Sequence, residues 1–206
     1  MRSRRSMRTV GDEFYTEGHR SLQDQFDTRR LADRLIEVTV HDTFTANDKR
    51  FVETAPFFWL ATADDEGWPD VSYKGGRPGF ARILDDERTL AFPSYDGNGM
   101  YRSLGNIAAN PRVGLLFVDF ERSKRLRVKG TARLHRDDAM LRAFPGAELV
   151  VTVAADKVFF NCPRYVHRMT VEHLSEFAPS GDHAPPEPEW KQRPEYRPFL
   201  PGTASG

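Results

Sequence analysis

Short apolar runs separated by charged or glycine-containing turns dominate the middle of this 206-residue chain. The first run, Phe57–Ala63, is followed by a turn at residues 64–67 and by a return run at residues 69–74. Apolar runs of strand length, with turns about every eight to twelve residues, are typical of antiparallel β proteins. The pattern predicts a mainly β chain, in which about six or seven antiparallel strands form a barrel with peripheral helices. Besides these two runs, strands are expected at residues 80–84, 89–93, 112–120 and 125–134 and a final short one at 165–169, and residues 149–153 and 158–160 are further candidates.

Helices are expected on both sides of these strands. Residues 21–38 carry apolar side chains at mixed three-to-five spacing, which predicts one amphipathic helix that packs one side on the body of the protein. Thr45, with Asp48 three residues later, has the pattern of a capping box, so a short helix should begin there and end near residue 55. Asp137 is expected to cap a further short helix over residues 138–143.

The distribution of proline divides the chain into one body and two tails. Seven of the 14 prolines lie in residues 179–206, which cannot form a packed core of their own. Residues 1–20 are polar and are expected to be flexible, and residues 21–178 should form a single domain. We interpret the proline-rich end either as a disordered tail or as an arm that a partner subunit orders.

Charge and cysteine content exclude several classes of function. Lys and Arg together number 30, as do Asp and Glu, so the chain lacks an overall basic field for nucleic acid or membranes. The single cysteine, Cys162, rules out a disulfide framework and a multi-thiolate metal site. The six histidines are scattered without metal-ligand spacing, so we expect no metal. No apolar stretch follows the basic start, so we expect a cytoplasmic protein without a secretory signal or a membrane span.

The segment 97–110 contains the residues best suited to bind a ligand. Its glycines allow a tight turn, and the helix that follows presents free N–H groups, which favour a phosphate. Arg102 and Ser103 fall in the first turn of this helix and offer a cation and a hydroxyl donor. A helix docked on a sheet, with Arg102 in solvent, is an equally tenable interpretation. The candidates from this segment are Asn98, Met100, Tyr101, Arg102 and Ser103.

A second group of candidates closes the strand that returns from the first turn. Lys74 offers another cation, Ser72 a hydroxyl, Tyr73 an aromatic surface and Gly75 accessible backbone. If the strands pair as a barrel, this group and the start of the helix meet at one end and can hold both a phosphate and a flat ring. Taken separately, Lys74 and Tyr73 read as a solvated strand end and a surface aromatic residue.

No catalytic group can be assigned from the residues. The chain has no Ser-His-Asp order, no Walker motif and no glycine fingerprint for a dinucleotide. Cys162 would need a base to act as a nucleophile, and none can be named. The alternative for Cys162 is a small buried hydrophobic residue.

Together these segments resemble the pyridoxamine 5'-phosphate oxidase-like, FMN-binding split-barrel proteins. The resemblance covers residues 57–168 and rests on FFWLATADDEGWPDVSYKGG, RPGFARILDDERTLAFPSYDGNGMYRSLGNIAANPRVGLLF and RLRVKGTARL. Its most typical mark is the corner at residues 110–113. The resemblance implies a split β-barrel, FMN as the cofactor, and a homodimer with two cofactor sites at the subunit interface. It also implies that Arg102 holds the cofactor phosphate, with Tyr101 and Ser103 as polar neighbours.

Other residues correspond to the family by position. Ser72, Tyr73 and Lys74 match the strand that runs along the flavin. Asn106 matches a polar residue that reaches the ring side across the interface. Trp190 resembles a C-terminal tryptophan that covers the flavin of the other subunit.

The chain departs from the vitamin-forming oxidase of this family in two respects. Its tail contains Arg193 and Arg197 without a matching histidine, and the insertion between the two cofactor segments is longer. The resemblance is closer to the oxidase-related branch, and it implies an FMN-dependent oxidoreductase acting on a small molecule. A non-catalytic flavin carrier or sensor, and a split barrel that binds deazaflavin or haem, are the alternatives.

Overall fold

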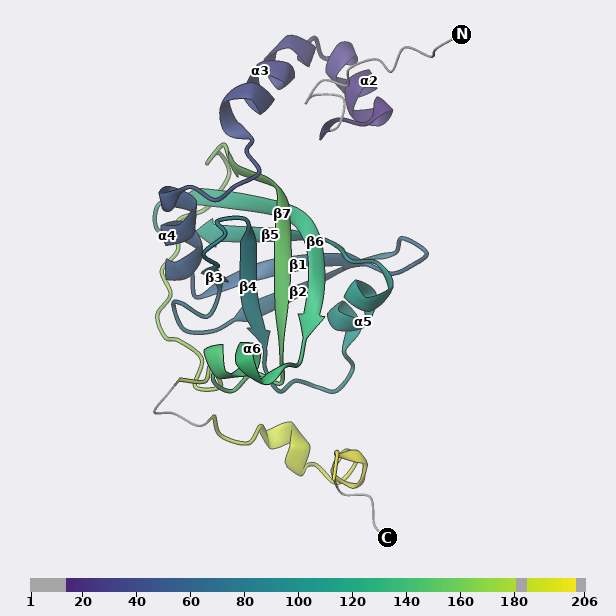
Figure 1. Ribbon diagram of the computed structural model, residues 1–206, viewed down its shortest axis with the longest axis vertical. Coiled ribbons are helices and arrows are strands. Elements are labelled where there is room, and N and C mark those ends of the chain that lie inside the picture. Colours follow the sequence, from purple (N-terminus) through teal and green to yellow (C-terminus); the bar gives the residue numbers. More distant parts are fainter. Residues whose placement is uncertain (1–13, 181–184, 203–206) are drawn as a thin grey trace.

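One antiparallel sheet of seven strands, in the order β2-β1-β5-β6-β7-β4-β3, forms the body of the computed structural model (Figure 1). The structure describes residues 14–180 and 185–202. It confirms the mainly β, antiparallel barrel predicted from the sequence. The strands are β1 (Phe57–Ala63), β2 (Pro69–Gly75), β3 (Arg82–Ile83), β4 (Thr89–Ser94), β5 (Arg112–Asp119), β6 (Lys124–His135) and β7 (Leu149–Asn161).

The sheet curls until strands that are distant in its order face each other across one core. The Phe58 ring on β1 lies 5.0 Å from the Phe92 ring on β4 and 4.8 Å from the Phe117 ring on β5, measured between centroids. In Figure 1, β1 and β2 accordingly run across the direction of β4 and β7. Because β1 and β4 are not hydrogen-bonded neighbours, this packing defines a split barrel rather than a flat sheet.

Alternation along the strands determines which face is buried. On β1 the even-numbered residues Phe58, Leu60 and Thr62 are buried, whereas the residues between them are partly or fully exposed. Successive side chains of a strand point to opposite faces, so the pleat of β1 directs these three residues to the core although apolar side chains lie on both faces.

Two short helices begin where the sequence predicts them. Helix α4 (Ala46–Thr54) starts at Thr45, whose hydroxyl oxygen accepts a hydrogen bond from the Asp48 N–H at 3.2 Å. The buried Asp48 carboxylate accepts in turn from the Thr45 N–H and hydroxyl, and lies 2.8 Å from the His41 ring. Helix α6 (Asp138–Ala143) is capped by the Asp137 carboxylate. Capping boxes and acidic caps are therefore reliable local signals in this chain.

The prediction of one helix over residues 21–38 is wrong. The chain forms two helices, α2 (Glu17–Gln25) and α3 (Arg29–Thr39), which are separated by Asp27 with φ of 52°. A left-handed residue interrupts the helical hydrogen bonds and turns the chain. Only Ala32 and Ile36 on these helices are buried, and Figure 1 shows both helices standing off one end of the barrel.

Three strand predictions also need correction. The expected strands at 149–153 and 158–160 are a single strand, β7, and the expected strand at 80–84 is reduced to β3. Residues 165–169 form no strand. They belong to a segment, residues 162–180, that crosses the outside of the barrel without helix or strand; we call it the strap.

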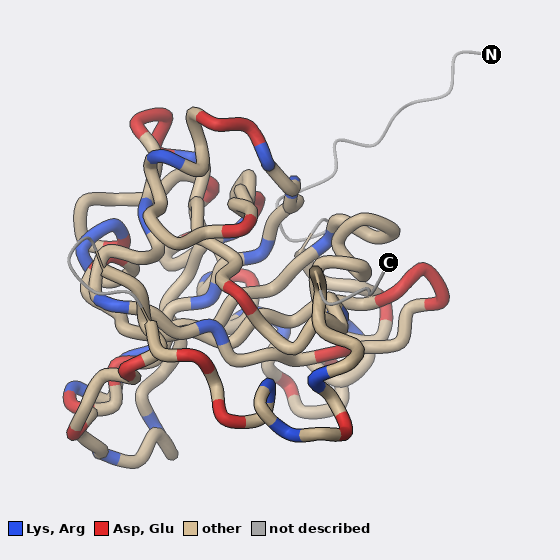
Figure 2. Tube along the Cα trace, turned by 90° about the horizontal axis from the view of Figure 1, so that it is seen from below, with Lys and Arg blue, Asp and Glu red and all other residues tan. Residues whose placement is uncertain are grey.

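The described part of the C-terminal tail lies at the opposite end of the barrel from α2 and α3 (Figure 1). It contains two 3-10 turns, η1 (Glu189–Gln192) and η2 (Arg197–Phe199), and Lys191 forms an ion pair with Asp96 of the barrel. The sequence predicts that residues 1–20 are flexible. Residues 1–13 lie outside the described residues, and α2 begins at Glu17. Acidic and basic residues are interspersed along the trace (Figure 2). None of the described helices is long and apolar enough to span a bilayer.

Candidate functional site

A cavity of about 340 Å³ opens where β2, the end of β4 and the start of helix α5 (Arg102–Ala109) meet. We call it the α5 cavity. Polar side chains and loop backbone make up most of its lining. Its lining residues are Asp70, Val71, Ser72, Lys74, Ser94, Tyr95, Gly97, Asn98, Gly99, Tyr101, Arg102, Ser103 and Leu104.

The first turn of α5 presents free backbone N–H groups at this cavity. The residue before the helix, Tyr101, is left-handed with φ of 48°, and no side chain caps the helix. The first helical hydrogen bond joins the Gly105 N–H to the Tyr101 carbonyl at 2.7 Å. The N–H groups of residues 102–104 therefore have no acceptor within the helix, and the positive end of the helix dipole lies beside them.

Side-chain hydrogen bonds fix α5 against the barrel. The Ser103 hydroxyl, on a residue only 6% exposed, donates to the Ser72 hydroxyl oxygen on β2 at 2.9 Å. One turn further on, the Asn106 amide donates to the buried Thr62 hydroxyl oxygen on β1 at 3.0 Å. The start of the helix is thus held at one position relative to the ends of β1 and β2.

Two cations line the cavity, and neither forms an ion pair with another described residue. Lys74 is half-buried, and the loss of solvation on burial lowers the pKa of its ammonium, an effect that the nearby Asp70 carboxylate only partly opposes. Neither Lys74 nor the exposed Arg102 makes a side-chain hydrogen bond or an ion pair with another described residue. Uncompensated cations next to free N–H groups favour a bound anion, and a phosphate suits this geometry.

The loop before α5 is ordered by its own side chains. The Asn98 carboxamide oxygen accepts from the Met100 N–H at 3.0 Å, and Gly99 has φ of 75°, which a residue with a Cβ would adopt only with strain. The Tyr101 hydroxyl donates to the Glu148 carboxylate at 3.2 Å, and the negative charge of Glu148 raises the pKa of this phenol. The loop therefore presents a defined wall to the cavity.

A second hollow of about 320 Å³ lies beyond the end of β2 and shares Tyr95 with the α5 cavity. The Tyr73 ring stacks on the Phe57 ring, with 5.4 Å between centroids and 21° between planes. Gly75 also lines the hollow, and a Cβ at this position would lie 2.6 Å from the Tyr73 ring. We call it the β2-end hollow; its flat aromatic wall suits a planar ring.

The structure brings some of the candidate residues together and places others elsewhere. The exposed Met100 side chain lines neither hollow, and it lies before the helix instead of on its apolar face. Asn106 faces Thr62 of its own chain. Trp190 packs its ring against Tyr196 in the tail, at 6.0 Å between centroids. The α5 cavity contains Ser72, Lys74, Asn98, Tyr101, Arg102 and Ser103, and the β2-end hollow contains Tyr73 and Gly75.

Tyr95 is the residue that sequence reasoning missed, since it lies in both hollows. Burial raises the pKa of its phenol. The signal for it was its position: it directly follows β4 and opens the loop that leads to Asn98.

Cys162 lies outside both hollows and is exposed, so the alternative of a buried hydrophobic residue is wrong. The Arg164 guanidinium donates to its sulfur at 3.3 Å, and hydrogen bonding from Arg164 lowers the pKa of the thiol. Among residues 14–180 and 185–202, no group of three or more His, Cys, Asp or Glu side chains is placed to hold a metal ion.

The split barrel thus places two cations and the free N–H groups of α5 beside a hollow with a flat aromatic wall. Residues 44–175 match the pyridoxamine 5'-phosphate oxidase family, and the chain belongs to this family. No curated protein matches the chain.

Solved structures with a similar fold come from several bacteria. HupZ of Group A Streptococcus is 22% identical, with 62% of this chain and 99% of that chain covered and a TM-score of 0.47. A candidate pyridoxamine 5'-phosphate oxidase from Lactobacillus delbrueckii is 26% identical, with 58% and 95% covered and a TM-score of 0.47. The FAD-binding protein from Mycobacterium smegmatis is 20% identical, with 60% and 97% covered and a TM-score of 0.41. The family match, and not these structures, supports the proposals below.

Proposed function

We propose that the protein binds FMN and acts as an FMN-dependent oxidoreductase on a small molecule. The observation that carries this proposal is the pair of uncompensated cations, Lys74 and Arg102, beside the free N–H groups of α5. Membership of a flavin-binding family supports it. The adjoining β2-end hollow offers a surface for the ring of the same ligand.

Each residue of the cradle has a physical role in this proposal. Arg102, the Ser103 N–H and the α5 dipole hold the phosphate, and Lys74 adds charge beside the phosphate or the ring. Ser72 and Tyr73 give hydrogen bonds and wall surface at the ring. FMN, when bound, would supply hydride transfer. We assign no proton donor.

Titration of the purified protein with FMN and with riboflavin tests this proposal. Riboflavin has the same ring without the phosphate. Half-maximal quenching of flavin fluorescence should therefore occur at a concentration roughly 100-fold lower for FMN than for riboflavin. Equal affinity for the two compounds would contradict the phosphate assignment. Bleaching of the bound flavin by NADH or NADPH with turnover would favour the oxidoreductase over a carrier or sensor. A deazaflavin preference or a Soret band with haem would favour the remaining alternatives.

We also propose a homodimer with the cofactor at its interface, because the outer face of β1, β2 and β5 is apolar. Val71 and Tyr73 on β2 are 64% and 61% exposed. They lie opposite Ala61 and Trp59 on β1, and Leu116 of β5 continues the row. Since Val71 also lines the α5 cavity, a second copy on this face would adjoin the cofactor.

Replacing Val71 with arginine should convert the dimer into a monomer, because burying an unpaired guanidinium in an apolar interface is strongly unfavourable. Light scattering should then give 23.6 kDa instead of twice this mass. Leu134→Arg is the matched control, since Leu134 is also an exposed apolar residue but lies on β6. A dimeric Val71→Arg protein, or a monomeric wild type, would refute the proposed interface.

FMN affinity should fall at alkaline pH in a way that depends on Lys74. The protonated ammonium attracts the phosphate, so affinity is lost as pH rises through the pKa of Lys74 in the free protein. Burial lowers that pKa, so the loss should begin below the usual lysine value of about 10.4. Fluorescence titrations between about pH 8 and 10 measure it, and the phosphate stays a dianion there because its second pKa is about 6. Lys74→Arg should flatten the profile; an unchanged profile in this variant would exclude Lys74.

A further inference from the structure

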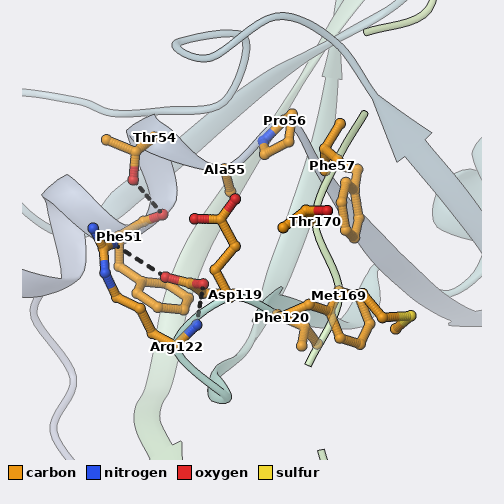
Figure 3. A pocket seen from close by; sticks show the side chains of 13 residues that line it. Phe51, Thr54, Ala55, Pro56, Phe57, Asp119, Phe120, Arg122, Met169 and Thr170 are labelled. Carbon is orange, nitrogen blue, oxygen red and sulfur yellow. Dashed lines mark hydrogen bonds and ion pairs between the residues drawn. The ribbon is translucent and has the colours of Figure 1, made fainter. Parts of the chain in front are cut away.

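A separate cavity of about 380 Å³ lies between α4, the start of β1, the end of β5 and the strap (Figure 3). It shares no lining residue with the α5 cavity. Phe51 comes from α4, Phe57 opens β1, Phe120 follows β5, and Met169 and Val171 come from the strap. We call it the strap cavity.

The walls of the strap cavity are mostly aromatic and apolar. The rings of Phe57 and Phe120 are stacked, with 6.2 Å between centroids and 27° between planes, and Phe51 comes from the side of α4. Figure 3 shows the labelled aromatic side chains arranged around the opening, with Met169 below Phe57. Flat aromatic walls favour a planar ligand, because stacked and edge-on ring contacts add to the gain from burial.

The charge at the rim favours a cation. Asp119 is already paired with Arg122, whose guanidinium lies 3.2 Å from the Asp119 carboxylate (Figure 3). The exposed carboxylate of Glu121 also lines the cavity, and it forms neither a hydrogen bond nor an ion pair in the described parts of the chain. With the arginine engaged, Glu121 leaves a net negative charge at the opening.

Among the described residues, two hydrogen bonds attach the strap to the barrel beside the cavity. Near the cavity its hydrogen bonds are long: the Met169 N–H donates to the Phe120 carbonyl at 3.4 Å, and the Ser123 hydroxyl to the Val166 carbonyl at 3.4 Å. Met169 and Val171 are each 49% exposed, so their apolar side chains are only partly covered by the rest of the chain.

We propose that the strap cavity is a second ligand site, which binds a flat aromatic compound that carries an amino group. The ring packs between Phe57, Phe120 and the strap, and the ammonium faces Glu121. The strap cavity shares no lining residue with the α5 cavity, where the phosphate is proposed to bind, and it adjoins the β2-end hollow through Pro56, Phe57 and Val171.

Three indole compounds with the same ring and different charge test this proposal on the full-length protein. Isothermal titration calorimetry should show the highest affinity for tryptamine, a lower affinity for indole and the lowest for indole-3-propionate. The exposed ion pair should make the affinity for tryptamine roughly fivefold higher than that for indole. Glu121→Gln should remove this preference and leave the affinity for indole unchanged, whereas Glu66→Gln, in the distant β1–β2 turn, should change neither. Equal affinity for tryptamine and indole-3-propionate, or no binding at all, would overturn the proposal.

A second variant separates this cavity from the flavin site. Met169→Trp, in a segment without helix or strand and at a position that lines neither the α5 cavity nor the β2-end hollow, should fill the strap cavity and lower the affinity for indole at least tenfold while the melting temperature is kept. Arg102→Ala should leave tryptamine binding intact. Retained indole binding in Met169→Trp, or loss of tryptamine binding in Arg102→Ala, would place the compound elsewhere and refute the assignment.

Discussion

Replacing Arg102 with alanine should weaken FMN binding by roughly 10- to 100-fold, as expected for the loss of a charge-assisted hydrogen bond of about 1.5 to 3 kcal/mol. Arg102 is exposed and has no partner among the described residues, so the protein should stay folded. Fluorescence titration measures the affinity. Riboflavin affinity should be unchanged, because the contact is made with the phosphate.

Arg112→Ala is the matched control for this variant. Arg112 is also exposed, but it lies past the opposite end of α5 and does not line the α5 cavity. If both variants keep the wild-type affinity for FMN, the phosphate is held elsewhere. If both variants weaken FMN binding equally, the cause is the loss of positive charge in general and not the loss of a specific contact with the phosphate.

Replacing Phe58 with alanine should lower the free energy of unfolding by roughly 3 to 5 kcal/mol. Phe58 is fully buried and its ring contacts the rings of Phe80, Phe92 and Phe117, so its removal leaves a cavity where the two sides of the barrel meet. For a chain of this size the melting temperature should fall by roughly 6 to 20 °C.

Phe199→Ala provides the comparison, since Phe199 is 85% exposed in the tail. Calorimetry should show almost no change for this variant. A Phe58→Ala protein with the melting temperature of the wild type would mean that the curled sheet does not close around this ring.

Local signals predicted most of the barrel because they act on neighbouring residues. The apolar run at Phe57–Ala63 located β1, and the capping box of Thr45 and Asp48 located the start of α4. These features depend on strand pleat and helix geometry alone. They needed no knowledge of distant parts of the chain.

The errors arose where tertiary contacts decide the structure. Between β6 and β7, Lys129 pairs with Lys157 but Gly130 pairs with Ala155, so the Asp156 position is an extra residue on β7. This bulge shifts the alternation by one, which is why one strand looked like two. A Cβ at Gly130 would lie 2.2 Å from the Ala154 carbonyl oxygen, so the irregularity requires glycine there.

The strap and the N-terminal helices show a different limit. Residues 165–169 have the composition of a strand, but their hydrogen bonds to the barrel go to Phe120 and Ser123 at the β5–β6 turn, and β5 and β6 are already paired on both sides. In α3 the amphipathic pattern predicted an apolar stripe, but it did not show which part of the protein would cover that stripe. In the structure Leu31 and Leu35 are exposed. The sequence pattern shows which face of a helix is apolar, whereas the surface that packs on this face depends on the complete fold.

The candidate site was predictable in part for the same reason. The turn at Gly97–Gly99 and the position of Arg102 in the first helical turn follow from local sequence, as does the end of β2 near Lys74. That the two segments meet depends on barrel closure. The contribution of Tyr95, and the contact of Asn106 with Thr62, depend on side-chain orientations that no spacing rule gives.

A crystal structure of the protein with FMN tests the central claim most directly. It should show the phosphate within hydrogen-bond distance of the Ser103 N–H and of the Arg102 guanidinium, with the ring extending toward Tyr73. A phosphate bound away from the start of α5, with the α5 cavity filled only by water, would contradict the account.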